Sequence, residues 1–295
     1  MSPADPSSKA TASAVAETAD ADDRYLVDAD EPQANGDKGD DKKEEPKPDK
    51  LTDNLKTVFW AILIAMIART FFFEPFSIPS SSMEPTLLVG DYLFVSKSPY
   101  GYSRHSFPFS AAPIDGRING EMPTRGDVIV FKEPTQNRTD YIKRVIGLPG
   151  DKVAMIDGQL YLNGEEVPRQ IDGTFTSRKS EFASETIYTR YIETLPGGKR
   201  HMIIEETDTG LYDNVTTRTV PEDHVFVMGD NRDNSRDSRY FESVPVENIV
   251  GRADVIFLSV DVPPSQNDNM FTSTLRTVKA VFTNLRTERS FEGIE

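Results

Sequence analysis

Beyond Pro75, apolar residues recur at every second position or form short runs bounded by turn residues, and both patterns are typical of β-strands. We predict strands over residues 91–95, 127–131, 141–148, 152–156, 159–162, 224–228 and 253–258. The dipeptides Asp157-Gly158 and Asn163-Gly164 favour the tight turns of β-hairpins. The section 158–221 is polar and less regularly patterned. The sequence thus predicts a mainly β protein, with an antiparallel β-sheet domain over residues 77–265 and an inserted β subdomain over about 158–221.

A continuous apolar run precedes these strands. The run over residues 55–76 is 22 residues long, and a helix of about 20 apolar residues crosses a bilayer. Spanning requires Lys56 and Arg69 to reach opposite headgroup regions, since a guanidinium inside the bilayer is costly. We predict one transmembrane helix over 55–76, with a buried helix of a soluble domain as the alternative.

Basic residues close to this run indicate its orientation. Lysines are frequent before it, and no Lys or Arg lies between Arg69 and Lys97 after it. The positive-inside rule then places the N-terminus in the cytoplasm and the β domain on the outer, periplasmic face of the cytoplasmic (inner) membrane.

The two ends of the chain differ from the middle. Residues 1–50 hold 14 Asp and Glu against 7 Lys and Arg, with few large apolar side chains, so we predict that residues 1–54 form a disordered acidic cytoplasmic tail. Residues 266–295 carry apolar residues at helical spacing, interleaved with Arg and Lys. This pattern predicts an amphipathic helix that lies on the membrane surface or packs against the domain.

Composition excludes several kinds of chemistry. The net charge of −15 argues against a nucleic-acid partner, because phosphate binding needs a basic face. The chain has no cysteine, which excludes thiolate catalysis and Cys-based metal sites. The three histidines, His105, His201 and His224, are scattered, and none has metal-ligand spacing to another.

A serine cluster between prolines, residues 79–85, follows the apolar run directly. Serine becomes a strong nucleophile only when a base removes its proton, and no histidine lies near a motif. Lys143 is an alternative base, because it lies within an apolar strand-like run where burial would lower its pKa. The competing interpretation is a solvated lysine on a strand surface, and a solvent-exposed turn for the polar segment 229–239.

Four segments in order resemble bacterial type I signal peptidases, the leader peptidase family. Residues 78–91 are similar to the family's nucleophile box, 125–131 to its second box, 141–151 to its lysine box and 229–240 to its Gly-Asp-Asn-Arg-Asp-Asn-Ser box. The likeness covers residues 55 to 260. Ser81 stands where glycine is frequent in the family.

The resemblance implies a Ser/Lys dyad, with Ser82 as the nucleophile and Lys143 as the general base. The Ser80 hydroxyl and the Ser82 backbone N–H would form the oxyanion hole, and Ser235 would orient Lys143.

Two ion pairs would stiffen this site, according to the same resemblance. They join Asp237 to Arg239 and Asp230 to Arg144.

The implied activity is that of a membrane-bound serine endopeptidase that removes signal peptides from exported preproteins. Small side chains at positions −1 and −3 would be preferred, and the peptide would add in extended form beside a strand. The implied partners are these signal peptides and membrane lipid, with contact to the secretion machinery left open. The resemblance implies neither a metal nor a cofactor. The alternative is a specialised Ser/Lys peptidase that processes one secretion or conjugation substrate.

Overall fold

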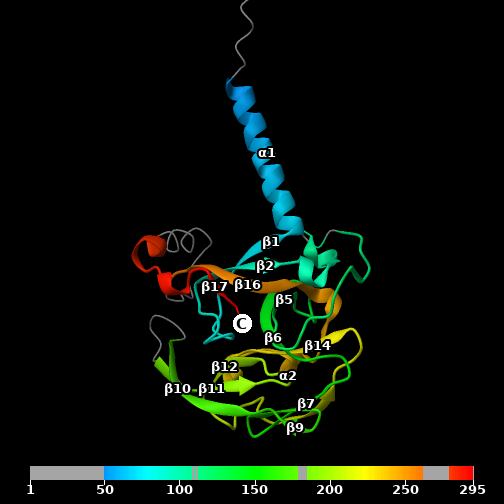
Figure 1. The fold of residues 1–295 in the computed structure, drawn as a ribbon, viewed down its shortest axis with the longest axis vertical. Helices are drawn as coiled ribbons and strands as arrows, with labels where there is room; N and C mark the ends of the chain where they lie inside the picture. Colours follow the sequence, from blue (N-terminus) through cyan, green and yellow to red (C-terminus); the bar gives the residue numbers. More distant parts are fainter. Residues whose placement is uncertain (1–49, 108–109, 111, 179–184, 262–278, 295) are drawn as a thin grey trace, which may run out of the picture. The chain divides into compact units, whose positions relative to one another are not determined.

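The computed structural model describes residues 50–107, 110, 112–178, 185–261 and 279–294. Its main feature is a curled antiparallel sheet with the strand order β1-β2-β16-β5-β6-β14-β15, and β17 also pairs with β16 (Figure 1). The strands are β1 Phe73–Ser77, β2 Asp91–Ser96, β5 Val128–Lys132, β6 Asp140–Gly147, β14 His224–Met228, β15 Val244–Pro245, β16 Ile249–Ser259 and β17 Glu292–Gly293. This confirms the predicted fold class, mainly antiparallel β with one N-terminal apolar helix.

Side chains from both faces of this sheet are buried. Alternate residues of a strand point to opposite faces, and in β5 Val128 and Val130 join one core cluster while Ile129 and Phe131 join another. The strand is therefore apolar at successive positions rather than at every second one. Both faces being covered fixes the register of β5 against β6, because a slip by one residue would exchange the two sets.

Two smaller sheets form the inserted part. One has the order β13-β7-β8-β9 and the other the order β10-β11-β12. Their strands are β7 Lys152–Ile156, β8 Gln159–Leu162, β9 Glu165–Glu166, β10 Arg169–Arg178, β11 Glu185–Thr194, β12 Arg200–Glu205 and β13 Val215–Thr219. The insert was predicted to start at residue 158, but the structure moves this start to β7. Strand β7 belongs to the four-stranded sheet, because it pairs with β8 and β13.

The predicted hairpin turns have the backbone that their sequences favour. Asp157 and Gly158 have φ values of 48° and 73°, and Asn163 and Gly164 have 56° and 87°. Two consecutive positive φ values are the signature of the type I′ turn, which matches the twist of the flanking strands.

Helix α1 spans Lys50–Phe71 and includes a candidate membrane span, Thr52–Phe71, whose side chains are exposed apart from half-buried Leu63 and buried Thr70. Its bounds correct the predicted 55–76 at both ends. Residues 73–77 form β1, since Pro75 has no N–H for a helix and disfavours helical backbone at the residue before it. Arg69 lies 2.8 Å from Glu74 and so has a carboxylate partner at the helix end. Of the disordered acidic tail predicted over 1–54, residues 1–49 lie outside the described residues, whereas residues 50–54 belong to α1.

The C-terminal segment also differs from its prediction. Of the helix predicted over 266–295, residues up to 278 lie outside the described part and residues 279–283 are helical. After them the chain makes a bridge at Leu285, the 3-10 turn η6 (Thr287–Arg289) and β17. Helical spacing alone missed this because Arg289 turns inward to Asp91, 2.8 Å away.

Short elements connect the sheets. They are η1 Ser98–Tyr100, β3 Tyr102–Ser103, η2 Arg104–Ser106, β4 Arg117–Ile118, η4 Arg232–Asn234, α2 Ser238–Phe241 and η5 Val246–Asn248. The turn η4 and helix α2 lie in the segment that follows β14, which borders the candidate site.

Candidate active site

Ser82 and Lys143 meet at the centre of the site. Ser82 lies in the loop between β1 and β2, and Lys143 lies in β6 with its Nζ 2.7 Å from Ser82 Oγ and 2.8 Å from the Ile142 carbonyl oxygen. Only 8% of Ser82 and 4% of Lys143 are exposed. The alternative interpretation of Lys143 as a solvated lysine on a strand surface is therefore wrong.

Burial changes the protonation of Lys143. It lowers the pKa of the ammonium to about 8, against opposing contributions from Asp237 and Asp230. Within the described residues, no carboxylate lies within ion-pair distance of Nζ. Near pH 8, the amine is neutral in about half of the molecules and can accept a proton from Ser82.

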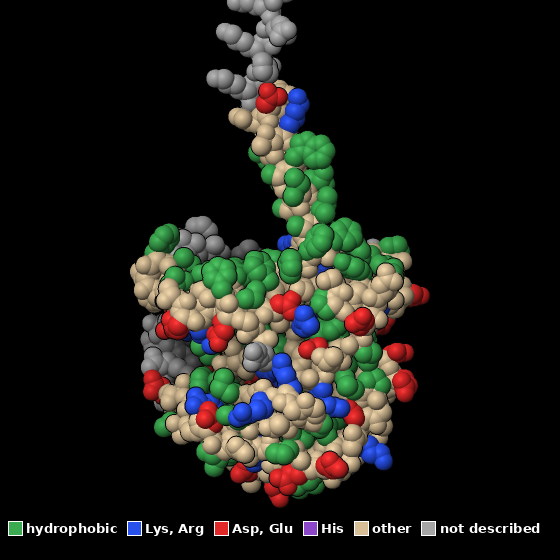
Figure 2. Space-filling view, viewed as in Figure 1, with side chains coloured by type: hydrophobic (Ala, Val, Ile, Leu, Met, Phe, Trp, Pro, Cys, Tyr) green, Lys and Arg blue, Asp and Glu red, His purple; other side chains and the backbone are tan. Residues whose placement is uncertain are grey.

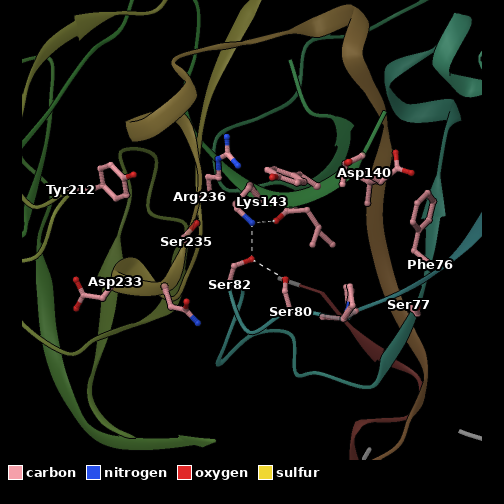
Figure 3. A pocket seen from close by; sticks show the side chains of 17 residues that line it. Phe76, Ser77, Ser80, Ser82, Asp140, Lys143, Tyr212, Asp233, Ser235 and Arg236 are labelled. Atoms are coloured by element: carbon pink, nitrogen blue, oxygen red, sulfur yellow. Dashed lines mark hydrogen bonds between the residues drawn. The ribbon is translucent and has the colours of Figure 1, made fainter. Parts of the chain in front are cut away.

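Ser80 lies beside Ser82 on the same loop. Its Oγ is 3.4 Å from Ser82 Oγ, and the side chain is exposed to solvent. Figure 3 shows Ser80 on the far side of Ser82 from Lys143. A hydroxyl there can donate to an oxygen that develops negative charge on a carbonyl attacked by Ser82.

Ser235 is close to the pair but is not hydrogen-bonded to Lys143 in the described structure. Both residues line one cavity, and Ser235 Oγ is buried without a well-aligned partner. It is close enough to Asp237 to help lower the pKa of that carboxyl. The hydrogen bond from Ser235 to Lys143 that the resemblance implies is therefore not formed in this structure.

Asp237 and Arg239 form a buried ion pair, with Nη2 2.9 Å from Oδ2 and Nε 3.0 Å from Oδ1. Burial alone would raise the pKa of Asp237, but the guanidinium and the Gly229 N–H hold it below its ordinary value. The pair closes the segment 229–239 on itself, which keeps the loop rigid beside Lys143.

Asp230 and Arg144 form the second predicted pair, also buried, with Nη2 2.8 Å from Oδ2 and Nε 2.9 Å from Oδ1. Arg144 follows Lys143 in β6, so this pair ties the strand that carries Lys143 to the segment after β14. The Thr86 hydroxyl donates to Asp230 at 2.6 Å. Arg144 and Thr86 hold the pKa of Asp230 below its ordinary value against the opposite effect of burial.

Sequence reasoning missed the contacts between the loop that carries Ser82, which joins β1 to β2, and the segment after β14. The Asn231 N–H donates to the Ser82 carbonyl at 3.1 Å, and Asn234 Nδ2 donates to Ser81 Oγ at 2.7 Å. A Cβ on Gly229 would lie 2.5 Å from the Ser82 carbonyl oxygen, so the approach requires glycine. The only signal was the density of Asn and Gly, which equally predicts a turn.

The three histidines lie away from the dyad. His105 Nδ1 is 2.9 Å from Ser110 Oγ, and His224 Nδ1 is 2.8 Å from the Glu222 carbonyl oxygen. His201 is buried beside Glu193, which in turn pairs with Arg232 at 2.6 Å. None of the three lines the cavity at Ser82.

A cavity of about 700 Å³ opens over the dyad. Figure 3 shows Ser82 and Lys143 at its middle, with Phe76, Ser77 and Asp140 on one side and Tyr212 and Asp233 on the other. Tyr212 comes from the inserted part, 130 residues after Ser82, and no sequence pattern pointed to it.

Comparisons with known proteins identify the family of the chain. A family model described as "Signal peptidase, peptidase S26" matches residues 51–258. The signal peptidase I of Rickettsia typhi is 35% identical over 244 residues, covering 80% of this chain and 90% of that protein. That of Rickettsia akari is 36% identical with the same coverage. A signal peptidase I crystal structure from Enterococcus faecalis is 29% identical and covers 45% of this chain and 97% of that one, with a TM-score of 0.27.

The family model spans all four segments that carried the resemblance, and the matching relatives cover most of the chain. Signal peptidase I is a serine endopeptidase. The chain belongs to the signal peptidase family, peptidase S26.

Proposed function

We propose that the chain is a membrane-bound signal peptidase that cleaves exported preproteins with a Ser82/Lys143 dyad. The observation that carries the proposal is the 2.7 Å separation of Lys143 Nζ and Ser82 Oγ in a buried site. A lysine with a pKa of about 8 is a base at that position, whereas an exposed lysine would stay charged.

The chemistry proceeds in two steps. Neutral Lys143 accepts the Ser82 proton while Oγ attacks the carbonyl carbon at position −1, and the resulting oxyanion binds the Ser80 hydroxyl and the Ser82 backbone N–H. The charged Lys143 then donates its proton to the nitrogen of the departing mature chain. Water attacks the acyl-enzyme with Lys143 again as base, which releases the signal peptide and restores Ser82.

The substrate lies in extended form along the loop 77–80 and the start of β6. Phe76, Ile78 and Ile142 line this side of the cavity, and they leave room for small side chains at −1 and −3. Backbone hydrogen bonds to an extended peptide give affinity with little dependence on its sequence.

Membrane attachment is supported by α1 and by the surface at its base. Figure 2 shows hydrophobic side chains gathered where α1 joins the domain, and Phe71, Phe72 and Phe73 are 42%, 57% and 53% exposed. The basic residues before α1 favour a cytoplasmic N-terminus and a catalytic domain on the outer face of the cytoplasmic membrane. Signal peptides and membrane lipid would be the partners at that surface.

The test is cleavage of a detergent-solubilised preprotein with Ala at −1 and −3, from pH 6 to 10. We expect wild-type activity to rise with pH through about 8, as Lys143 loses its proton. Ser82→Ala and Lys143→Met should each lose at least about 10³-fold in kcat, since they remove the nucleophile and the base.

Retained activity in Ser82→Ala would overturn the assignment of the nucleophile, and retained activity in Lys143→Met would place the base elsewhere. Several unrelated preproteins should all be cut. Cleavage of one alone would favour the specialised peptidase.

A further inference from the structure

The cavity over the dyad continues past Ser82 to a wall that the reaction steps above do not use. This wall consists of Tyr212, Asp233, Asn234 and Arg236. Tyr212 belongs to the loop Glu206–Asn214 of the inserted part, and the other three follow β14. The wall therefore joins two segments that are far apart in the sequence.

The loop of the insert is fixed to the segment after β14. Asp233 Oδ2 accepts the backbone N–H groups of Glu206 at 2.6 Å and Thr207 at 3.0 Å. The Tyr212 ring packs edge-on against Tyr240 with 6.2 Å between centroids. These contacts fix the loop Glu206–Asn214 and so hold Tyr212 at the cavity.

Arg236 differs from the other charged side chains that line the cavity. Asp140 is paired with Lys132 at 2.8 Å, and Asp233 is bonded to the insert loop. Arg236 is exposed and stacks on the Tyr240 ring at 4.2 Å. Within the described residues it has no ion pair or hydrogen bond, so its five N–H donors are available to a ligand.

The direction of the substrate follows from the proposed function, on which this inference rests. Helix α1 leads directly into β1, so the Phe76 end of the cavity is the end next to the membrane. A signal peptide arrives from the membrane and occupies that end. The first residues of the mature chain then lie at the other end, where Tyr212 and Asp233 stand (Figure 3).

We propose that this wall binds the first three residues of the mature chain, +1 to +3, and that Arg236 selects an acidic side chain among them. Tyr212 provides an apolar surface for the mature segment. The guanidinium of Arg236, already oriented by the Tyr240 ring, pairs with an Asp or Glu carboxylate.

Cleavage of a peptide series tests the role of Arg236. Each peptide has Ala at −1 and −3 and carries Asp, Asn or Lys at +1, +2 or +3. Wild type should cleave the Asp peptide about fivefold better than the Asn peptide in kcat/KM at one of these positions, since a partly exposed ion pair contributes up to about 1 kcal/mol. The preference should fall as salt is added. Arg236→Glu should reverse it in favour of Lys, and Arg236→Lys should keep it.

Lys152→Glu is the matched control, because Lys152 is exposed on β7 and does not line the cavity. This substitution changes the net charge by the same amount as Arg236→Glu. It should keep the wild-type preference. Binding of the same peptides to Ser82→Ala, measured by fluorescence anisotropy, should rank Asp above Asn without any turnover.

The outcomes separate this inference from the proposed function. Cleavage of all peptides with equal kcat/KM at +1 to +3, or an unchanged preference in Arg236→Glu, would overturn the role of Arg236 and leave the peptidase assignment intact. An absence of Ser82-dependent cleavage of every peptide would overturn both.

Discussion

At the scale of single residues, burial of Lys143 lowers the free energy of unfolding by a measurable amount. Its pKa is about 8 in the folded protein and about 10.5 in an unfolded chain. Between these values the unfolded state binds the proton and the folded state does not, so stability rises with pH across that window. Below pH 8 both states are protonated and the full penalty for burying the charge remains.

We therefore predict that Lys143→Met is more stable than wild type at pH 7 by about 3 kcal/mol. The difference should shrink from pH 8 to 10.5 as wild type gains stability. Urea unfolding of the two proteins in detergent at pH 7, 9 and 10.5 measures it. A wild type that is more stable than the variant at pH 7, with no dependence on pH, would contradict the buried position.

At the scale of elements, the buried pair of Arg144 and Asp230 connects β6 to the segment after β14. Both side chains are almost fully buried, and Arg144 also donates to the Gly126 carbonyl at 2.8 Å. A buried ion pair adds little over an apolar pair of equal volume, but losing one partner leaves a charge buried without compensation. The pair thus serves to hold β6 beside the segment after β14 and adds little net stability.

We predict that Arg144→Met lowers the free energy of unfolding by about 3–5 kcal/mol. Adding Asp230→Leu to that variant should recover much of the stability but not the activity, because the strand and the loop lose their alignment. Urea unfolding and peptide cleavage of the single and double variants distinguish the two effects. A loss below about 1 kcal/mol in the single variant would mean that water reaches Asp230.

At the scale of the whole molecule, the C-terminal segment returns to the loop that carries Ser82. Arg289 Nη2 donates to the Thr86 carbonyl and to Asp91 Oδ2, both at 2.8 Å, and Arg286 Nη1 donates to the Val89 carbonyl at 3.1 Å. β17 meanwhile pairs with β16. The last residues of the described chain therefore support the segment that follows Ser82.

Removal of residues 285–295 should destabilise the protein by about 3 kcal/mol or more, since it leaves buried Asp91 without its guanidinium. It should also lower kcat through a less rigid Ser82 loop. Thermal unfolding and peptide cleavage of the truncated chain check both. Arg289→Lys, which keeps the charge, should lose less than Arg289→Ala; equal losses would argue against the ion pair.

The sequence by itself determined the local features of this protein. Alternating apolar residues and short apolar runs predicted the strands, and Asp157-Gly158 and Asn163-Gly164 predicted the hairpin turns, whose φ values are positive in the structure. Such features depend on a few neighbouring residues, so they can be read without the fold. The four family segments likewise identified Ser82 and Lys143 as candidates.

Only the tertiary structure decided what these residues touch. Lys143 and Ser82 are 61 positions apart, and their contact depends on the pairing of β5, β6 and β14 around the nucleophile loop. The burial that lowers the pKa of Lys143, the arrival of Tyr212 at the cavity and the inward turn of Arg289 depend on the same packing. Sequence periodicity reports which face of an element is buried but not which distant element covers it, and that is why these contacts required the fold.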